Sequence, residues 1–489
     1  MQFSGLPLDI IENEKKLTDQ IRAYEEMMYN ESIEQNPDSS RIDNIKNKLF
    51  YLKNDYDYLL TSIEKEYPEY YNLKYNPKFI TADQVKENLN TNQAIIEYSY
   101  SDSLITCFVI DRNQVSLLSI PIPGDFGQEC YDFYELIRNQ SFVNDVLPTY
   151  QKYQELARTF YKVLMEPVLA KTRKRHITII PDGPLVYLPF EAFLTSDVDP
   201  YYVNYTTLPY LIYNVSIGYS YSSTLLYSKR PETVKPLNRV LAYAPSYENL
   251  FNDTLQLVWN REANPDRLVS LKGVYKEVNA ISEIVKSDVY IDDKATETSF
   301  KENAGKYAVL HLAMHTILND EDPLYSRLVF TRNSKDTLND NNLFTYEIYN
   351  MQISAKMTVL SSCSSGFGKM LRGEGLLSLA RGFIYAGCPS IIMTLWQAPD
   401  NSSPELMTSF YRHLKRGDNK IEALRKAKIE YLKSSDGLWA NPYFWSPFVV
   451  IGDNSPIYRK MDFFYWSLLI AGFGGLVVLS VLRLRRRMH

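Results

Sequence analysis

The chain has 489 residues, a net charge of −5, and 39 tyrosines against 19 glycines. This length accommodates two or three domains with a large core. The acidic balance offers no overall basic field, so we expect no nucleic-acid partner. The four cysteines form no CxxC pair, which argues against a zinc site or a thioredoxin motif, and we expect no metal and no cofactor.

The first part of the chain predicts two helices, at residues 10–34 and 41–66. Apolar residues recur at spacings of three and four in both segments, which is the pattern of an amphipathic helix. Ser40 is in place to cap the second helix. Because only about six residues join the segments, we expect an antiparallel helical hairpin, with a coiled coil as the competing interpretation.

A capping box at Thr81 and Gln84 predicts a short helix that ends at Leu89. Short β-prone runs separated by turn residues follow, which predicts an antiparallel meander at residues 94–100, 104–110 and 115–120. Residues 150–169 read as an amphipathic helix that ends in a basic pentamer, and 176–193 as a buried strand followed by a turn. The pentamer suits a solvated helix end better than a nucleic-acid patch.

From Arg239 onward, strands and helices alternate along the chain. The predicted strands are 239–245, 307–313, 357–362, 389–395 and 448–452, and the predicted helices are 276–285, 376–386, 404–415 and 420–433. Such alternation predicts a mostly parallel sheet with helices on both faces.

Two of these strands end in residues that carry chemistry. The run YAVLHLA leads into His315, and the run MTVLSS leads into Cys363, which is followed by Gly366 and Gly368. Ligands and catalytic groups of open α/β sheets lie at the carboxyl ends of the strands. Cys363 follows His315 by 48 residues, a spacing typical of the cysteine nucleophile and histidine of caspases.

Several segments, in order, resemble the CHAT family of caspase-like proteins. They are LHLAMH (310–315), SSCSSGFGK (361–369), GEGLLSLARGFIYAGCPSIIMTLW (373–396), ELMTSFYRHLKRG (405–417) and NPYFWSPFVVIGD (441–453), with ITIIPDGPLVYLPFEAF (177–193) and YLIYNVSIGYSYSSTLL (210–226) in the amino-terminal half. The resemblance covers roughly residues 80–453. CHAT domains are similar to separase, belong with the caspase-like cysteine peptidases, and often follow arrays of TPR helical hairpins.

The resemblance implies the domain organisation. Residues 1–75 are the TPR-like remnant of such an array, and residues 76–453 are the CHAT domain. Within it, residues 76–235 form an amino-terminal half and residues 236–453 form the catalytic half. The remnant implies a regulatory partner that binds through helical repeats.

The resemblance also implies the site. Cys363 is the nucleophile and His315 the base, and the backbone amides of Cys363 and Thr316 form the oxyanion hole. Two residues depart from the family pattern: Thr316 stands where a Gly usually follows the histidine, and Ser364 where a Glu usually follows the cysteine. A Thr resists an unusual φ that Gly accepts freely, which puts activity in question.

Asp400 looks like the acidic residue of separases, which cut after arginine. It would then bind a basic residue before the scissile bond, although an Asp in the turn PDNSS also suits the cap of the helix that starts near Pro404. Each site residue has a structural alternative, because a buried Cys is usually a small hydrophobe and a His at a strand end is usually a hydrogen-bonded structural residue. We expect His311 to point to the other face of its strand and assign it no role.

Residues 463–482 form an apolar run of twenty residues without a charge, followed by RLRRR. The run is long enough to cross a membrane, so we expect a transmembrane helix at 462–482, a basic tail at 483–489, and a single-pass membrane protein. The positive-inside rule places the tail in the cytoplasm and the domain outside, but residues 1–20 offer no signal peptide. Two alternatives stay open: a fragment, which the absent array favours, or a tail-anchored protein that faces the cytosol.

Taken together, the sequence predicts an α/β caspase-like fold preceded by a helical hairpin and followed by one transmembrane helix. The predicted function is a membrane-anchored cysteine endopeptidase that acts on a protein or peptide substrate. A catalytically silent CHAT scaffold that binds partners at the membrane is the alternative, favoured by Thr316 and Ser364.

Overall fold

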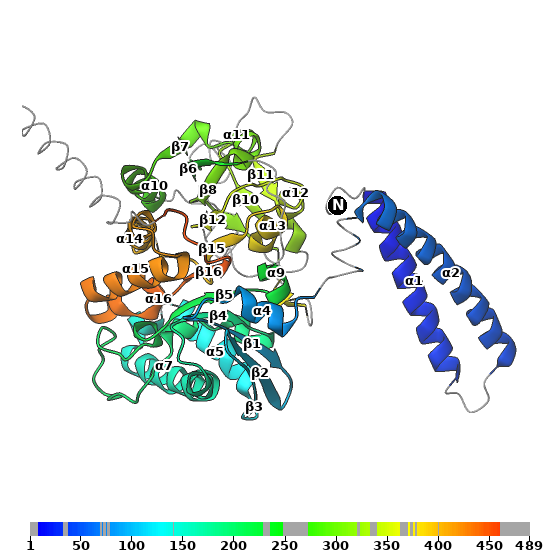
Figure 1. The fold of residues 1–489 in the computed structure, drawn as a ribbon, viewed down its shortest axis with the longest axis horizontal. Coiled ribbons are helices and arrows are strands. Elements are labelled where there is room, and N and C mark those ends of the chain that lie inside the picture. Colours follow the sequence, from blue (N-terminus) through cyan, green and yellow to red (C-terminus); the bar gives the residue numbers. More distant parts are fainter. Residues whose placement is uncertain are drawn as a thin grey trace, which may run out of the picture.

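A computed structural model describes residues 8–32, 38–68, 71, 75, 79–139, 141–227, 235–247, 272–319, 323–332, 340–361, 370–371, 375–376, 379–399 and 401–459. Figure 1 shows a helical hairpin and a larger α/β body.

The hairpin consists of α1 (Leu8–Ser32) and α2 (Ser39–Glu66), which pack side by side (Figure 1). The apolar stripe of α2 is buried in this contact at Ile45, Leu49 and Leu52. The cap of α2 is Asp38, whose carboxylate accepts the N–H groups of Ser40 and Arg41. The expected cap at Ser40 is therefore wrong by two residues, because the helix already begins at Ser39 and Ser40 lies in its first turn.

The hairpin has a small apolar cluster of its own. Ile63 of α2 is buried against Ile10, Leu59 and three tyrosines, Tyr67, Tyr71 and Tyr75. This cluster is separate from the main core of the body.

Among the described residues, eleven strands of the body form one sheet, in the order β3-β2-β1-β4-β5-β16-β15-β12-β8-β6-β7. The strands are β1 (Gln93–Tyr100), β2 (Leu104–Asp111), β3 (Val115–Pro121), β4 (His176–Ile180), β5 (Ser216–Tyr219), β6 (Leu237–Ala244), β7 (Ser287–Ile291), β8 (Tyr307–Leu312), β12 (Met357–Leu360), β15 (Ser390–Thr394) and β16 (Phe448–Gly452). A three-stranded sheet contains β9 (Thr316–Ile317), β10 (Arg327–Val329) and β11 (Asn342–Phe344). A two-stranded sheet contains β13 (Met370–Leu371) and β14 (Gly375–Leu376).

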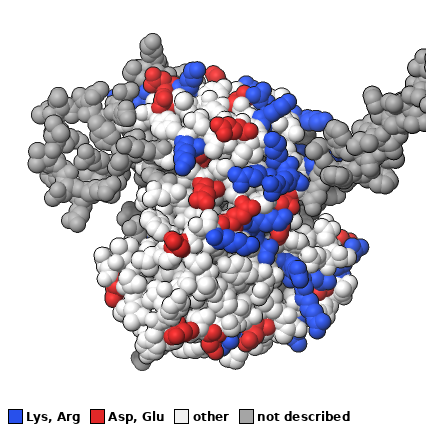
Figure 2. All heavy atoms as spheres, turned by 90° about the vertical axis from the view of Figure 1, so that its left-hand side faces the viewer, with Lys and Arg blue, Asp and Glu red and all other residues white. Residues whose placement is uncertain are grey.

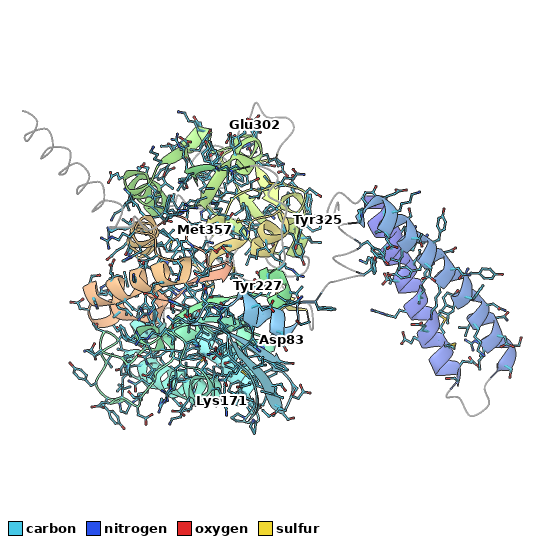
Figure 3. The ribbon with its side chains drawn as sticks, in the orientation of Figure 1. Asp83, Lys171, Tyr227, Glu302, Tyr325 and Met357 are labelled. Carbon is cyan, nitrogen blue, oxygen red and sulfur yellow. The ribbon has the colours of Figure 1, made fainter. Side chains whose placement is uncertain are left out.

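The strands β1, β2 and β3 form the predicted antiparallel meander, and β1 continues the sheet in parallel with β4, which pairs in parallel with β5. The strands β15, β12, β8, β6 and β7 pair with one another in parallel. The mostly parallel sheet is therefore confirmed. Met357, labelled in Figure 3, opens β12 in the middle of the body.

The last strand, β16, lies in the middle of the sheet and joins its two parts. β16 pairs antiparallel with β15 on one side and parallel with β5 on the other. The final strand of the chain therefore lies between the strands that precede residue 227 and those that follow residue 236.

The helices of the body are α4 (Ala82–Asn88), α5 (Phe126–Arg138), α6 (Ser141–Asn144), α7 (Val146–Phe160), α8 (Glu166–Lys171), α9 (Ser223–Tyr227), α10 (Lys272–Ile284), α11 (Glu297–Asn303), α12 (Thr345–Ile348), α13 (Leu379–Tyr385), α14 (Ser403–Lys415), α15 (Lys420–Ser434) and α16 (Pro442–Trp445). The predicted capping box of α4 is present at Thr81 and Gln84. Figure 1 shows α10, α14 and α15 on one side of the sheet and α12 and α13 on the other. Helices thus cover both faces, as expected for right-handed crossovers that leave the sheet in opposite directions.

The amphipathic helix predicted at 150–169 is real but interrupted. It consists of α7, a π-helical turn at Tyr161–Met165, and α8. A π turn inserts one residue into the i→i−4 ladder, which a pattern of apolar residues does not reveal.

Helix α15 carries contacts to the amino-terminal part of the sheet. Its Lys428 ammonium lies 2.5 Å from the carboxylate of Glu191, and both side chains are almost fully buried. The Glu191 carboxylate also accepts the hydroxyl of Tyr219 on β5, at 2.7 Å. One turn earlier in α15, the Arg425 guanidinium donates to the carbonyl oxygens of Ile212 and Tyr213. These charged groups tie α15 to residues far away in the sequence.

Positive and negative side chains intermingle on the face in Figure 2, which looks onto the left side of Figure 1. Lys and Arg gather in a band there, with Asp and Glu set among them. Around α14 and α15, Lys426 lies 2.8 Å from Asp418, which is in the loop between these two helices, and the Nε2 of His413 lies 2.9 Å from Glu430.

The predicted localisation in a membrane is contradicted. Within the part of the chain that the structure describes, no helix is both long and apolar enough to span a bilayer. The helices of sufficient length there are α1, with 25 residues, and α2, with 28, and charged side chains occur along both. Residues 462–482, on which the prediction rested, lie outside the described residues, as does the basic tail.

Candidate functional site

The carboxyl ends of three neighbouring parallel strands, β6, β8 and β12, meet at one edge of the sheet. From β6 the chain crosses to β7 on one side, and the strands that follow β7 lie on the other side of β6. The edge between β6 and β8 is therefore a topological switch point, where ligands of open α/β sheets bind.

The strand register places Leu312 and Leu360 side by side at this edge. Leu312 of β8 pairs with Leu360 of β12, and the Ser361 N–H donates to the Leu312 carbonyl oxygen at 3.0 Å. His315 is three residues beyond Leu312, and Cys363 is three residues beyond Leu360. Cys363 itself lies outside the described residues, as do Ser364 and Asp400.

His315 is partly buried, and hydrogen bonds hold its main chain on both sides. Its N–H donates to the hydroxyl of Tyr247 at 2.9 Å, and its carbonyl oxygen accepts the N–H of Val329 on β10 at 3.0 Å. Its imidazole lies against the ring of Tyr247, with ring centres 4.7 Å apart and planes at 60°. The base candidate is thus fixed beyond the end of its strand, where β8 no longer supplies ladder bonds.

Tyr247 is the residue of this site that the sequence did not reveal. It follows the last residue of β6 by three positions, the same offset by which His315 follows β8. Its side chain is only 1% exposed, and its hydroxyl donates to the Val329 carbonyl oxygen at 2.9 Å. With 39 tyrosines in the chain, the residue type alone carries little information. Tyr247 follows β6 by as many residues as His315 follows β8. This equal offset points to Tyr247 only once β6 and β8 are known to be neighbours.

Thr316 begins β9 and pairs with Leu328 of β10. Among the described non-glycine residues, only Asp292 and Asn341 have a positive φ. Thr316 therefore lies in extended backbone that any residue adopts, and the unusual φ that would have favoured Gly does not occur there.

The thiols of Cys107, Cys130 and Cys388 are buried. Burial raises the pKa of the Cys107 thiol to about 12 and also raises the pKa of the Cys130 thiol. The Sγ of Cys388 donates to the Ser390 carbonyl oxygen at 3.2 Å and accepts the Thr358 hydroxyl at 3.3 Å. Since the thiolate is the reactive form, these three cysteines serve as structural residues.

His311 lies in β8 and is fully buried against α10 and α14. Its Nδ1 is 3.2 Å from the Tyr411 hydroxyl, and its Nε2 is 2.9 Å from a Glu277 carboxylate oxygen. The contact between Nε2 and Glu277 does not have the geometry of a hydrogen bond. Tyr411 itself is buried, which raises its pKa. These contacts account for His311 as a packed residue of the helix-covered face.

The aromatic residues near the carboxyl end of the domain belong to the core. Trp396 is 2% exposed and donates its Nε1–H to the Tyr443 carbonyl oxygen at 3.1 Å, and Trp445 is fully buried. No group of His, Cys, Asp or Glu in the described stretches is arranged to hold a metal ion.

The family model of the CHAT domain matches residues 154–453, more than half of the chain. The chain belongs to the CHAT domain family. The resemblance read from the sequence is thereby confirmed, over a somewhat shorter range than the 80–453 expected.

The CHAT chain is also similar to tetratricopeptide repeat protein 28. The protein of Mus musculus is 30% identical over 114 residues, and that of Homo sapiens is 29% identical over the same length. The match takes in 22% of this chain and spans 4% of the length of either relative.

Two solved structures resemble this chain at low sequence identity. The separase of Saccharomyces cerevisiae, in its complex with securin, gives a TM-score of 0.45 at 10% identity and covers 75% of this chain and 31% of its own. The Arg-specific cysteine proteinase gingipain R gives a TM-score of 0.36 at 12% identity and covers 69% of this chain and 76% of its own.

Proposed function

We propose that this CHAT protein is a cysteine endopeptidase in which Cys363 is the nucleophile and His315 the general base. The observation that carries the proposal is the register of β8 and β12. Because Leu312 pairs with Leu360, His315 and Cys363 follow paired positions by the same three residues. Membership of the CHAT family supports the same assignment.

The chemistry requires these two side chains and main-chain donors. The His315 imidazole takes the proton from the Cys363 thiol, and the thiolate attacks the carbonyl carbon of the scissile peptide bond. The imidazolium then gives its proton to the leaving amine, and the acyl group remains on the sulfur as a thioester. A water molecule, deprotonated by the imidazole, attacks that thioester, which releases the acid and restores the thiol.

The amides of Cys363 and Thr316 are the proposed oxyanion donors. The extended backbone of Thr316 supports this role, since a threonine there adopts its φ without strain. The donor is the main-chain N–H, which Thr316 carries just as a Gly at this position would.

The proposed substrate is a protein or peptide with a basic residue before the scissile bond, bound by Asp400. A carboxylate that binds a desolvated cation discriminates strongly, because an unpaired buried charge is costly. The competing role for Asp400, as the cap of α14, is weakened by the helix start: α14 begins at Ser403 and Ser402 occupies its N-cap position. A peptide library varied at that one position distinguishes the two. We expect an Arg or Lys preference that Asp400→Asn removes, and a preference unchanged by that substitution would exclude the pocket.

The alternative is a catalytically silent CHAT scaffold that binds a protein partner. It rests on the two departures from the family pattern, Thr316 and Ser364. Because the φ of Thr316 presents no obstacle, Ser364 is the departure on which this alternative now depends.

A peptide-based covalent thiol probe separates the two functions. The endopeptidase labels rapidly at a single cysteine, Cys363→Ala abolishes labelling, and Cys388→Ala, the matched control at a buried thiol, leaves the labelling rate unchanged. A scaffold labels no faster than an unactivated thiol. Labelling that persists in Cys363→Ala would assign the reactivity to another residue.

A further inference from the structure

Three hydrogen bonds form a closed arrangement around the main chain of His315. The His315 N–H donates to the Tyr247 hydroxyl at 2.9 Å, that hydroxyl donates to the Val329 carbonyl oxygen at 2.9 Å, and the Val329 N–H donates to the His315 carbonyl oxygen at 3.0 Å. The hydroxyl of Tyr247 thus bridges the main chain just after β8 and the main chain of β10. Val329 and Tyr247 are 6% and 1% exposed, so water has little access to these groups.

The side chain of His315 is held by the same residue. The Tyr247 ring faces the imidazole at 4.7 Å between centres, close enough to restrict rotation of the imidazole about its side-chain torsions. Tyr247 therefore contacts His315 twice, through its hydroxyl at the main chain and through its ring at the imidazole.

The neighbourhood of Tyr247 is itself firmly anchored. The Ser246 N–H donates to the Thr331 hydroxyl at 3.0 Å, and on the adjacent strand the Ala313 N–H donates to the Tyr243 carbonyl oxygen at 3.0 Å. The first bond joins the segment after β6 to Thr331, and the second extends the pairing of β6 and β8 by one residue past the end of β8.

We infer that Tyr247 is the positioning residue of the His315 base. This inference rests on the proposed function, in which His315 must lie within hydrogen-bond reach of the thiol. A misplacement of about 1 Å costs roughly a hundredfold in rate, so a loop residue needs such a clamp. Tyr247 acts through His315 and has no chemical step of its own.

Three variants separate the contributions of the hydroxyl and the ring. Tyr247→Phe keeps the ring and removes the hydroxyl, and Tyr247→Leu removes both. Tyr243→Phe is the matched control: Tyr243 is also buried and lies on β6, its hydroxyl makes one side-chain contact at 3.1 Å to Ser299, and its ring stacks on Tyr290.

The first readout is independent of catalysis: the NMR signals of His315 in the full chain, assigned with His315→Gln. We expect Tyr247→Phe to shift the His315 amide signal, Tyr247→Leu to shift the imidazole signals as well, and Tyr243→Phe to shift neither. Imidazole signals that are unchanged in Tyr247→Leu overturn the inference.

The second readout is the covalent peptide probe, analysed as a binding constant and a maximal rate of inactivation. We expect Tyr247→Phe to lower the maximal rate roughly tenfold and Tyr247→Leu roughly a hundredfold, with the binding constant within about twofold of the parent. Tyr243→Phe should keep the parent rate. An equal loss in Tyr243→Phe, or no loss in Tyr247→Leu, overturns the inference.

His315→Ala distinguishes a failure of the inference from a failure of the proposed function. If His315→Ala labels as fast as the parent, the proposed base is wrong, and the NMR readout alone decides whether Tyr247 positions the imidazole. If His315→Ala is slow while both Tyr247 variants keep the parent rate, the base is right and the positioning role is wrong.

Discussion

At the scale of single residues, the buried thiols of this chain differ chemically from a nucleophile. Cys107 lies in β2 with no exposed surface, and burial raises the pKa of its thiol to about 12. At neutral pH it stays protonated and shielded, so iodoacetamide should leave it unmodified in the folded chain and modify it after unfolding. Mass spectrometry of the two samples checks this, and rapid native labelling of Cys107 would contradict it.

The same thiol makes stability depend on pH. The ordinary pKa of a thiol is near 9, so between pH 9 and about 12 the folded chain keeps a proton that the unfolded chain loses. The folded state binds more protons in this window, and stability falls as pH rises through it, by about 1.4 kcal/mol per pH unit at most. Urea unfolding of the parent and of Cys107→Ala at about pH 8 and pH 10.5 measures this. We expect the free energy of unfolding to fall less between the two pH values in Cys107→Ala than in the parent. Equal falls in the two proteins would contradict the raised pKa of Cys107.

At the same scale, His315 could be predicted from the sequence, but the tyrosine beside it could not. The histidine was found because it directly follows an apolar run, and its family segment includes it. Tyr247 also follows an apolar run, but its meaning depends on β6 and β8 being neighbours, which is a long-range fact. Sequence patterns report what lies along one element, whereas strand order is set by packing across the whole sheet.

At the scale of elements, α15 depends on its buried charges. Removing one partner of a buried ion pair leaves the other charge uncompensated. Lys428→Met should therefore cost about 3–5 kcal/mol, because among the described residues the Glu191 carboxylate then keeps only the hydroxyl of Tyr219 as a donor. In Lys428→Met combined with Glu191→Gln no charge remains, and we expect less than half of that loss. Urea denaturation of the single and double variants tests this prediction for the ion pair of Lys428 and Glu191. A double variant that is less stable than Lys428→Met would contradict the prediction.

Most elements could be predicted from local patterns, and the misses have physical causes. The strands of the sheet are short apolar runs between turn residues, which periodicity detects. The cap of α2 was misplaced by two residues because Asp38, Ser39 and Ser40 are all good caps, and only geometry selects one. The place of β16 between β5 and β15 could not be predicted, since its partners lie far away in the chain.

At the scale of the whole molecule, the hairpin and the body have separate cores. The hairpin buries Ile63 within its own cluster, apart from the main core. A chain that begins at residue 79 keeps the whole sheet and the bond from the Ile80 N–H to the Thr224 hydroxyl. We expect this shortened chain to unfold within about 2 °C of the parent and to keep its probe reactivity. A large drop in thermal stability would mean that the hairpin braces the body.

The sequence-based domain boundaries at residues 75 and 235 stay predictions. The order of the sheet shows why a boundary at 235 is not a simple cut: β16 belongs to the later part of the chain and pairs with β5 of the earlier part. The two proposed halves therefore share one sheet, and we expect neither to fold alone.

The proposed function requires that His315 and Cys363 together break peptide bonds. The most direct test is the appearance of new peptide termini, measured by mass spectrometry, when a peptide library is incubated with the purified full chain. We expect cleavage by the parent and its loss in Cys363→Ala, in His315→Ala and in the double variant, to about the same extent, because the two side chains act as one unit. A Cys363→Ala protein that cuts the library at the parent rate would contradict the assignment of Cys363 and His315 as the catalytic pair.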